Sequence, residues 1–509
     1  MPSRVLYLLL ISLSSLWSMS LFAAQICNTS MSASTPESRF TVNNDETVTD
    51  SVTGLTWRQC VEGMSGTNCS TGSASKFTWQ EALIHAESQT SWRLPNIKEL
   101  ISLIERRCQN PAIALSIFPA TPENPESFFW SSSLSAANTA KAWSIDFASG
   151  FNGNLGLRTN SFYVRLVKGG GTSNTVALVA PENLVAVAGN GQVSLTWDGV
   201  SAASSYQLVD EAGQVLVATV TESTYVFTGL TNNQSYTFRV ASRDAAGKLS
   251  AYSPVVTAMP QLNPDPIDEY SYKEPLKLTD TGIIWGGNYP DMNNTTCIGE
   301  TITEQDCSHG QDFADNDGSD GHAGFSFTKI ASDGSILPAS ANVWACVRDN
   351  VTNFMWEVKQ GGNNIVGDEG LHDTDDRYNS YDTNTITNGG YSGYEDNNGA
   401  TCHAYQANNP ASYCNTEAFV NRVNKASLCG YSDWSMPTPE ALRSIVDYSR
   451  FKPSIDIDYF PATKLNWYWS SSPDASKPYL TRYVDFNYGN DGNYNHYNDL
   501  YVRLVRGGK

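Results

Sequence analysis

The stretch "WSSSLSAANTAKAWSIDFASGFNGNLGLRTNSFYVRLVKGG", residues 130–170, returns as "WSSSPDASKPYLTRYVDFNYGNDGNYNHYNDLYVRLVRGG", residues 469–508. The spacing from the first Trp to the closing Arg differs by a single position between the copies. In each copy, alternating apolar and polar residues flank a loop rich in Gly and Asn, which predicts two strands joined by that loop. The chain therefore repeats one structural unit.

The repeat continues upstream in the same order in both copies. "WRLPNIKELISLIERR" from Trp92 corresponds to "WSMPTPEALRSIVDYSR" from Trp434, and "VTDSVTGLTW" from Val48 corresponds to "VRDNVTNFMW" from Val347. A third, shorter stretch, "KLTDTGIIW" from Lys277, is similar to these two Trp-ending stretches. It indicates that the second copy carries an added N-terminal layer.

Capping residues predict two helices in each copy. Thr78 and Glu81 form a capping-box pattern, and Asn415 is the corresponding cap in the second copy. Asn96 and Thr438 precede the second helix of each copy, where apolar residues recur at helical spacing. Two helices followed by the strand–loop–strand ending make each copy a compact α+β module, so we expect a multidomain fold with such modules at both ends.

Residues 178–260, between the copies, have a different character. Short β-rich runs alternate with turn residues without a helical period, which predicts an all-β sandwich. Trp197, the "TGL" turn at Thr228 and Tyr236 resemble the core tryptophan, turn and corner tyrosine of a fibronectin type III domain. The resemblance implies a spacer, and without an RGD sequence there is no reason to expect integrin binding.

The outer modules resemble the Lcl C-terminal domain family. The motifs are "VTDSVTGLTW", "WRLPNIKEL", "FPAT", "WSSS" and "YVRLVKGG" in residues 27–170, and "ACVRDNVTNFMWEVK", "LHDTDDRY" and "LCGYSDWSMPTPEAL" in residues 270–509. The resemblance implies modules of the broad C-type-lectin-like grouping, which also contains the formylglycine-generating enzymes. It also implies a binding role, because the family is named for an adhesin whose domain binds sulfated glycosaminoglycans.

Residues 1–24 predict export. Arg4, the apolar body "VLYLLLISLSSLWSMSLF" and the small residues Ala23 and Ala24 form a signal-peptide pattern, with an uncleaved anchor as the alternative. No later segment is apolar for the length that a bilayer requires, so the mature chain is expected in the periplasm, at the cell surface or outside the cell. The net charge of −20 argues against nucleic acid as a partner.

The ten cysteines, an even number on each side of the central domain, predict disulfides in an exported chain. Spacing alone does not fix their pairing. Short loops favour three pairs and leave two longer ones: Cys60–Cys69, Cys297–Cys307 and Cys402–Cys414, then Cys27–Cys108 and Cys346–Cys429. Each half is then expected to be stable by itself.

Three function classes compete. They are a surface or secreted binding protein, lectin-like or adhesin-like, with two modules on a spacer; a structural component of an envelope or filament assembly; and a hydrolase. No catalytic residue is predicted, because the GxSxG and HExxH patterns are missing and the six histidines are scattered. We therefore expect a glycan or a surface protein as the ligand and no enzymatic activity.

No cofactor is expected to be required, although one acidic loop could hold calcium. Asp315, Asp317 and Asp320 lie close together among glycines, and oxygen-rich loops of this kind bind calcium. The loop does not follow the EF-hand pattern, so a solvated acidic loop is the competing interpretation. The stretch "LHDTDDRY", residues 371–378, offers the same two alternatives.

The loops between the closing strands are the candidate ligand-binding surface, since the copies differ there. Amides can hydrogen-bond sugar hydroxyls, and exposed aromatic rings can cover a sugar face. The candidate residues are Phe151, Asn152, Asn154 and Arg158 in the first copy and Tyr494, Asn495 and His496 in the second. The cation of the first loop would tolerate an anionic sugar, whereas the acids of the second favour a neutral ligand or one bound through a cation. Solvated hairpin loops are the alternative.

The residues shared by both copies have a structural interpretation. Trp130 and Trp469 are expected in the core. The accompanying acids and arginines are expected to form ion pairs between strands: Asp146 with Arg165, and Asp485 with Arg503.

Overall fold

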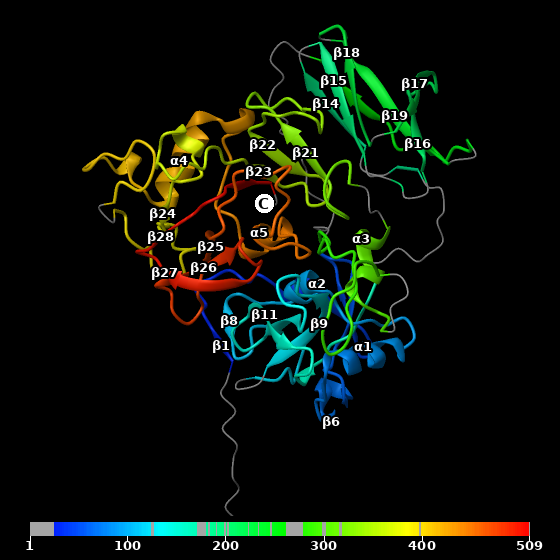
Figure 1. The fold of residues 1–509 in the computed structure, drawn as a ribbon, viewed down its shortest axis with the longest axis vertical. Helices are drawn as coiled ribbons and strands as arrows, with labels where there is room; N and C mark the ends of the chain where they lie inside the picture. Colours follow the sequence, from blue (N-terminus) through cyan, green and yellow to red (C-terminus); the bar gives the residue numbers. More distant parts are fainter. Residues whose placement is uncertain are drawn as a thin grey trace, which may run out of the picture.

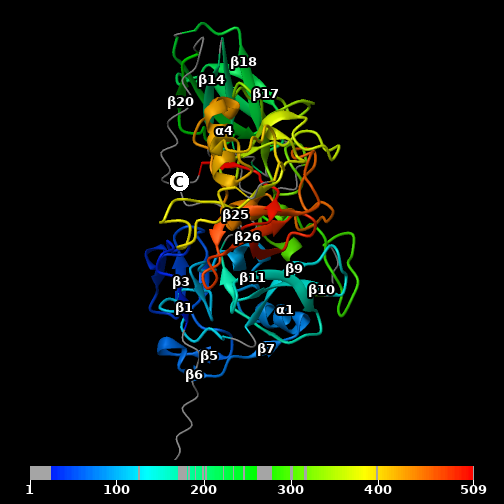
Figure 2. The same ribbon diagram turned by 90° about the vertical axis from the view of Figure 1, so that its left-hand side faces the viewer.

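The structure is a computed structural model of the chain. It describes residues 25–123, 127–169, 180–181, 184–189, 191–197, 200, 203–221, 223–232, 234–244, 247–260, 278–297, 302–314, 318–396 and 399–507. The first module and the central domain lie at opposite ends, and the second module lies between them (Figures 1 and 2). Within the described residues, no helix has both the length and the apolar character to cross a membrane.

The first module is built from two main sheets and two helices. One sheet contains, in spatial order, β13 (Val167–Lys168), β4 (Thr56–Arg58), β3 (Thr47–Asp50) and β2 (Phe40–Val42). The other contains β11 (Phe151–Leu157), β10 (Lys141–Asp146), β9 (Phe128–Leu134), β12 (Phe162–Tyr163) and β7 (Lys76–Phe77). The helices are α1 (Trp79–Glu87) and α2 (Ile97–Ile101); short pairs join β1 (Ile26–Cys27) to β8 (Cys108–Gln109) and β5 (Met64–Ser65) to β6 (Thr71–Gly72).

The second module repeats this topology. One sheet contains β21 (Phe327–Ile330), β22 (Cys346–Asp349), β23 (Met355–Glu357) and β29 (Val505–Arg506). The other contains β27 (Asp491–Asn495), β26 (Leu480–Asp485) and β25 (Trp467–Pro473), next to the pair of β28 (Asp499–Leu500) and β24 (Tyr378–Asn379). A parallel bridge from Tyr468 to Tyr501 corresponds to the parallel pairing of Phe129 with Tyr163 in the first module. The helices are α3 (Gly310–Ala314), α4 (Thr416–Ala426) and α5 (Pro439–Ser444).

The central domain is the expected sandwich. Its sheets contain β14 (Val185–Gly189), β15 (Gln192–Thr196) and β18 (Thr224–Thr228), and β17 (Val215–Val220), β16 (Ser205–Val209), β19 (Tyr236–Arg243) and β20 (Val256–Ala258). Trp197 is buried in the core, and the Tyr236 hydroxyl accepts a hydrogen bond from the Thr231 N–H at 3.0 Å. The domain touches the second module where Arg348 Nη2 donates to Thr196 Oγ1 at 2.7 Å.

The predicted caps are present in both modules. The capping box of Thr78 and Glu81 opens α1, and Asn96 forms a second one at α2. Asn415 and Thr438 accept the corresponding backbone hydrogen bonds at α4 and α5. Helices nevertheless make up only 12% of the described residues, because each module places most of its residues in short strands and loops.

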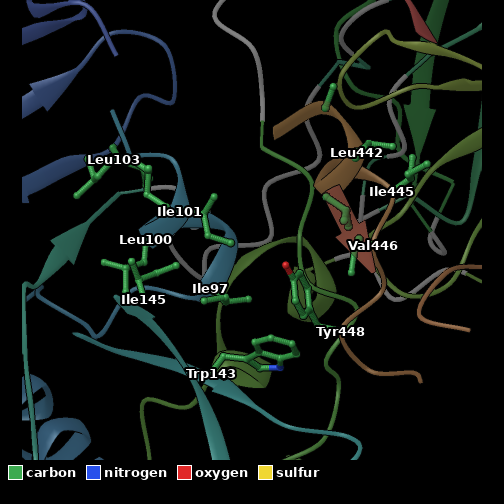
Figure 3. Close-up of a cluster of buried hydrophobic side chains, with 14 of the residues drawn as sticks. Ile97, Leu100, Ile101, Leu103, Trp143, Ile145, Leu442, Ile445, Val446 and Tyr448 are labelled. Carbon is green, nitrogen blue, oxygen red and sulfur yellow. The ribbon is translucent and has the colours of Figure 1, made fainter. Parts of the chain in front are cut away.

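The two modules share one hydrophobic core. Side chains from α2 and α5 line it from opposite sides, and Trp143 and Tyr448 lie next to each other within it (Figure 3). The rings of Trp143 and Tyr448 meet edge to face with their centroids 4.9 Å apart. The expectation that a spacer separates two self-contained halves is wrong, because each module supplies part of the other's interior.

Five disulfides are formed, in the pairs that the loop lengths favour. They are Cys27–Cys108, Cys60–Cys69, Cys297–Cys307, Cys346–Cys429 and Cys402–Cys414. Each disulfide joins two cysteines of the same half of the chain. The two halves are therefore held together by packing and polar contacts.

Candidate functional site

A cavity of about 430 Å³ opens at the edge of the β27–β26–β25 sheet. We call it the tyrosine pocket. Its lining residues are Arg377, Asn466, Trp467, Tyr494, Tyr497, Asn498, Asp499, Leu500 and Tyr501. They come from the start of β25, the end of β27, β28 and the loop before β24, which the second sheet brings together.

Trp467 and Tyr494 of the pocket lining belong to a cluster of three aromatic rings, the third being Tyr483 behind the lining. Trp467 stacks on Tyr483 with centroids 4.4 Å apart and an interplanar angle of 14°. The Tyr494 ring meets the Trp467 ring edge to face, and their centroids lie 5.2 Å apart. Tyr494 is 40% exposed, so this cluster offers an aromatic surface to solvent.

A second aromatic cluster begins at Tyr497, another residue of the lining. Tyr497 is 55% exposed and its ring lies 6.3 Å from that of Tyr394, which is 44% exposed. The Tyr394 ring lies 6.4 Å from that of Tyr391, which in turn meets the His496 imidazole at 5.3 Å. Exposed tyrosines therefore continue beyond the cavity itself.

The lining also contains polar side chains. Asn466 accepts a hydrogen bond from the Trp467 N–H at 2.8 Å, and the Asn498 amide donates to the Asn495 carbonyl at 3.1 Å. These contacts orient both amides through only part of their hydrogen-bonding capacity. With Arg377 and Asp499, they give the pocket donors and acceptors beside its aromatic walls.

The second hairpin thus contributes to the pocket in part. Tyr494 lines it, whereas the Asn495 side chain stabilises its own turn by accepting from the Tyr497 N–H at 3.3 Å. His496 is buried, and its Nε2 lies 2.8 Å from Thr481 Oγ1. Burial lowers the pKa of His496 to about 4, so the imidazole is neutral at physiological pH. His496 packs edge to face against Tyr391 and is buried, so it is not a surface ligand, contrary to the sequence prediction.

The first hairpin is not a solvent-facing recognition loop. Asn152 is buried against the second module, where its N–H donates to the Asp491 carboxylate at 2.8 Å and its amide donates to the Tyr448 hydroxyl at 3.2 Å. The Phe151 ring lies beneath the Arg482 guanidinium at 4.5 Å. The Asn154 side chain lies outside the described part of the structure.

Arg158 is also buried, beneath the N-terminal layer of the second module. It donates to the Asn288 carbonyl, to the Met292 carbonyl at 3.1 Å and to Asn293 Oδ1. Burial lowers the pKa of Arg158 to about 10. The predicted anionic-sugar contact is therefore wrong, because backbone and amide oxygens already occupy this guanidinium.

At the equivalent edge of the first module, aromatic rings pack against one another in the described residues. Phe128 stands two residues before Trp130, as Trp467 stands two residues before Trp469. Phe128 stacks on Phe162 at 5.1 Å, and Phe162 packs on Trp130 at 4.4 Å. A phenylalanine pair thus fills this edge, whereas the second module has Leu500 in the place of Phe162 and leaves a cavity.

The calcium prediction finds no support in the described residues. Asp315 and Asp317 lie outside them, and Asp320 accepts a hydrogen bond from Ser326 at 2.5 Å. In the second acidic stretch, Asp373 and Asp376 are buried and accept backbone N–H groups. Among the residues that the structure describes, no cluster of three or more His, Cys, Asp or Glu side chains could hold a metal ion.

The shared tryptophans are structural, as expected. Trp130 Nε1 donates to the Phe77 carbonyl and Trp469 Nε1 donates to the Tyr378 carbonyl, both at 2.8 Å.

The predicted Asp–Arg ion pairs are wrong. Arg503 instead donates to the Glu357 carbonyl at 2.7 Å and to Thr463 Oγ1 at 2.9 Å, and Arg165 makes the equivalent contacts. The acids close turns: Asp146 accepts from the Ala148 N–H and Asp485 accepts from the Asn487 N–H.

A larger cavity of about 840 Å³ runs along α5 between the modules. Its walls are rich in hydroxyl side chains, among them Ser34, Thr35, Thr352, Thr387 and Ser471. Its aromatic members include Trp434, which is buried. The sequence does not predict this larger cavity, because its walls come from both modules and form only where the modules meet. Trp467, by contrast, could have been found as the residue that replaces Phe128 beside a tyrosine-rich ending.

Comparison with known proteins agrees with the modular organisation. The Lcl C-terminal domain model matches residues 46–168 and 345–506, and the fibronectin type III model matches residues 179–259. No curated protein matches the chain.

Three solved structures show limited similarity. A Yersinia enterocolitica family 28 exopolygalacturonase is 21% identical over 17% of this chain and 21% of its own, with a TM-score of 0.15. A Parabacteroides distasonis β-1,2-glucanase is 18% identical over 21% and 16%, with a TM-score of 0.16. A Clostridium thermocellum Fn3-like protein is 23% identical over 17% and 98%, with a TM-score of 0.15. The chain thus spans about a fifth of the first two proteins.

The two matched regions of the first family model cover more than half of the chain. They coincide with the two modules that repeat one topology around a shared core. The protein belongs to the Lcl C-terminal domain family, with a fibronectin type III domain inserted between two copies of the family's module.

Proposed function

We propose that the protein is an exported, non-enzymatic binding protein that recognises carbohydrate through the tyrosine pocket of its second module. Family membership and the fibronectin type III domain fit a surface or secreted protein that carries binding modules. The five disulfides are compatible with export. So is the finding that no helix in the described residues is long and apolar enough to cross a membrane. The C-type-lectin-like character of the modules is part of the same proposal.

The observation that carries the proposal is the combination of exposed aromatic faces and amides in one small cavity. Trp467 and Tyr494 form a ring surface that can cover the apolar face of a sugar. Asn466 and Asn498 lie beside that surface with donors and acceptors for hydroxyl groups. The cavity volume of about 430 Å³ falls within the range of small-molecule sites, roughly 300–1,000 Å³.

The proposal also assigns one binding site to the chain, although the module is repeated. The first module fills the equivalent edge with Phe128 and Phe162, and its hairpin is buried against the second module. The first module then acts as a partner that completes the core of the second.

A glycan screen with paired variants tests this function. The intact protein should bind a defined set of glycans, and the double variant Tyr494→Ala/Tyr497→Ala should lose about 5- to 150-fold in affinity, since each ring contact contributes roughly 0.5–1.5 kcal/mol. Phe451→Ala is the matched control, because Phe451 is an exposed ring of the same module outside the pocket. Binding that the double variant retains in full would reject the pocket, and capture of envelope proteins without any glycan would favour a structural role.

A further inference from the structure

We infer that the tyrosine pocket takes an uncharged linear polysaccharide and contacts several consecutive sugar units of it. This inference rests on the proposed carbohydrate-binding function and adds the ligand's charge and length. The sulfated polymers that the family resemblance implies are a different chemical class.

The length of the ligand follows from the extent of the aromatic surface. Trp467, Tyr483 and Tyr494 form one cluster, and Tyr497, which also lines the cavity, begins a second one with Tyr394. A sugar ring is about as large as one aromatic ring, so a single sugar cannot cover both clusters. Tyr394 does not line the cavity, yet it is 44% exposed next to Tyr497. A ligand that uses this ring must extend out of the pocket.

The charge of the ligand follows from the ionisable groups around these rings. Arg377 is the cationic side chain among the lining residues, and Asp499 is an acidic side chain of the same lining. His496 is neutral because burial lowers its pKa. Near Tyr394 the chain places Glu395 and Asp396, and the Tyr405 hydroxyl donates to the latter at 3.1 Å. A sulfated polymer needs clustered Arg or Lys residues, which this surface does not offer in its described residues.

The neutral donors and acceptors complete the argument. The hydroxyls of Tyr494 and Tyr497 and the amides of Asn466 and Asn498 surround the cavity. Hydroxyl and amide groups pair with sugar hydroxyls without requiring a charge on the ligand. The whole chain carries a net charge of −20, which repels polyanions at long range.

Affinity electrophoresis of the full chain tests both properties. Native gels would contain one soluble polymer each: mixed-linkage β-glucan, laminarin, hydroxyethyl cellulose, galactomannan, amylose or heparin. We expect at least one uncharged polymer to retard the protein at 150 mM salt and heparin to leave it unretarded. Retardation by heparin alone, or by none of the uncharged polymers, overturns the inference.

A second arm tests length. For the polymer that retards the protein most, oligosaccharides of one to six units would compete for binding, and potency should rise at least tenfold between one and four units. Tyr394→Ala should weaken polymer binding roughly 2- to 10-fold, while Tyr394→Phe restores it. Equal potency of the monosaccharide and the tetrasaccharide, with binding still lost in Tyr494→Ala, would overturn the inference and leave the carbohydrate-binding function intact.

Discussion

Asn152 and Asp491 stand at the same distance after Trp130 and Trp469, and the N–H of Asn152 donates to the carboxylate of Asp491 at 2.8 Å. The two copies therefore contact each other through equivalent positions. Their equivalent helices α2 and α5 also pack together, so the arrangement is approximately two-fold. At this contact the first copy supplies a backbone N–H and the second copy supplies a side-chain carboxylate, while the Asn152 amide donates to the Tyr448 hydroxyl. The two copies share one buried core, and the first hairpin lies in their contact, whereas Tyr494 of the second hairpin faces solvent.

Asp491 is the carboxylate that a group of buried arginines shares. It pairs with Arg443 and lies 3.8 Å from Arg106 and 4.0 Å from Arg482. Replacing Asp491 by Ala removes the carboxylate that Arg443 contacts directly, while Glu440 remains paired with Arg106. Because Arg443 then loses its nearest buried counter-charge, we expect the free energy of unfolding to fall by about 3–5 kcal/mol. Thermal denaturation of the variant and of the unaltered protein measures this loss of stability.

The control for this substitution is Asp433→Ala. Asp433 pairs with Arg506 at 2.7 Å on the surface, with its side chain 59% exposed, and should cost less than about 1 kcal/mol. If the two variants destabilise the protein equally, the buried charge network does not hold the modules together.

The shared core predicts that both modules unfold together. Trp143 and Tyr448 belong to different modules and are both buried in one cluster. Scanning calorimetry of the full chain should therefore show one cooperative transition for the two modules, with any separate transition belonging to the fibronectin type III domain. Two resolved module transitions would restore the independent halves that the sequence suggested.

Stability should also fall as the pH rises from about 4 to 8. Burial raises the pKa of Asp280 and Asp312 to about 7 and that of Asp306 to about 8, above the unfolded value of 3.8. A carboxyl group with a raised folded pKa contributes stability that is complete below the unfolded pKa and is lost as the pH passes the folded pKa. The melting temperature should therefore be higher at pH 5 than at pH 8.

Asp306→Asn isolates this effect. An amide oxygen can still accept from Ser133 and Thr281, which donate to Asp306 at 2.5 and 2.9 Å. We expect the variant to gain at least about 1 kcal/mol at pH 8 and to gain little at pH 4.5. Equal effects at both pH values would show that Asp306 does not titrate with folding.

The repeated frame could be predicted because local chemistry determines it. Thr78, Asn96, Asn415 and Thr438 cap helices through groups within the same turn, so the sequence alone identifies them. Short loops likewise favoured the disulfide pairs, since neighbouring cysteines meet at little entropic cost.

The binding surface was predicted only in part because tertiary contacts decide which loops are exposed. Asn152 and Tyr494 both lie in Gly- and Asn-rich hairpins, yet one is buried at the interface and the other faces solvent. Arg158 looked like a free cation because its partners, Asn288 and Asn293, lie more than a hundred residues away. No local pattern reveals that the second copy covers the first.

The most direct test of the central claim is hydroxyl-radical footprinting of the full chain with and without the polysaccharide that retards it most. If the tyrosine pocket is the binding site, protection should be confined to Trp467, Tyr494, Tyr497 and Tyr394, while Phe151 and Phe451 keep their oxidation rates. Protection of other surfaces, with unchanged oxidation of Tyr494 and Tyr497, would contradict the account.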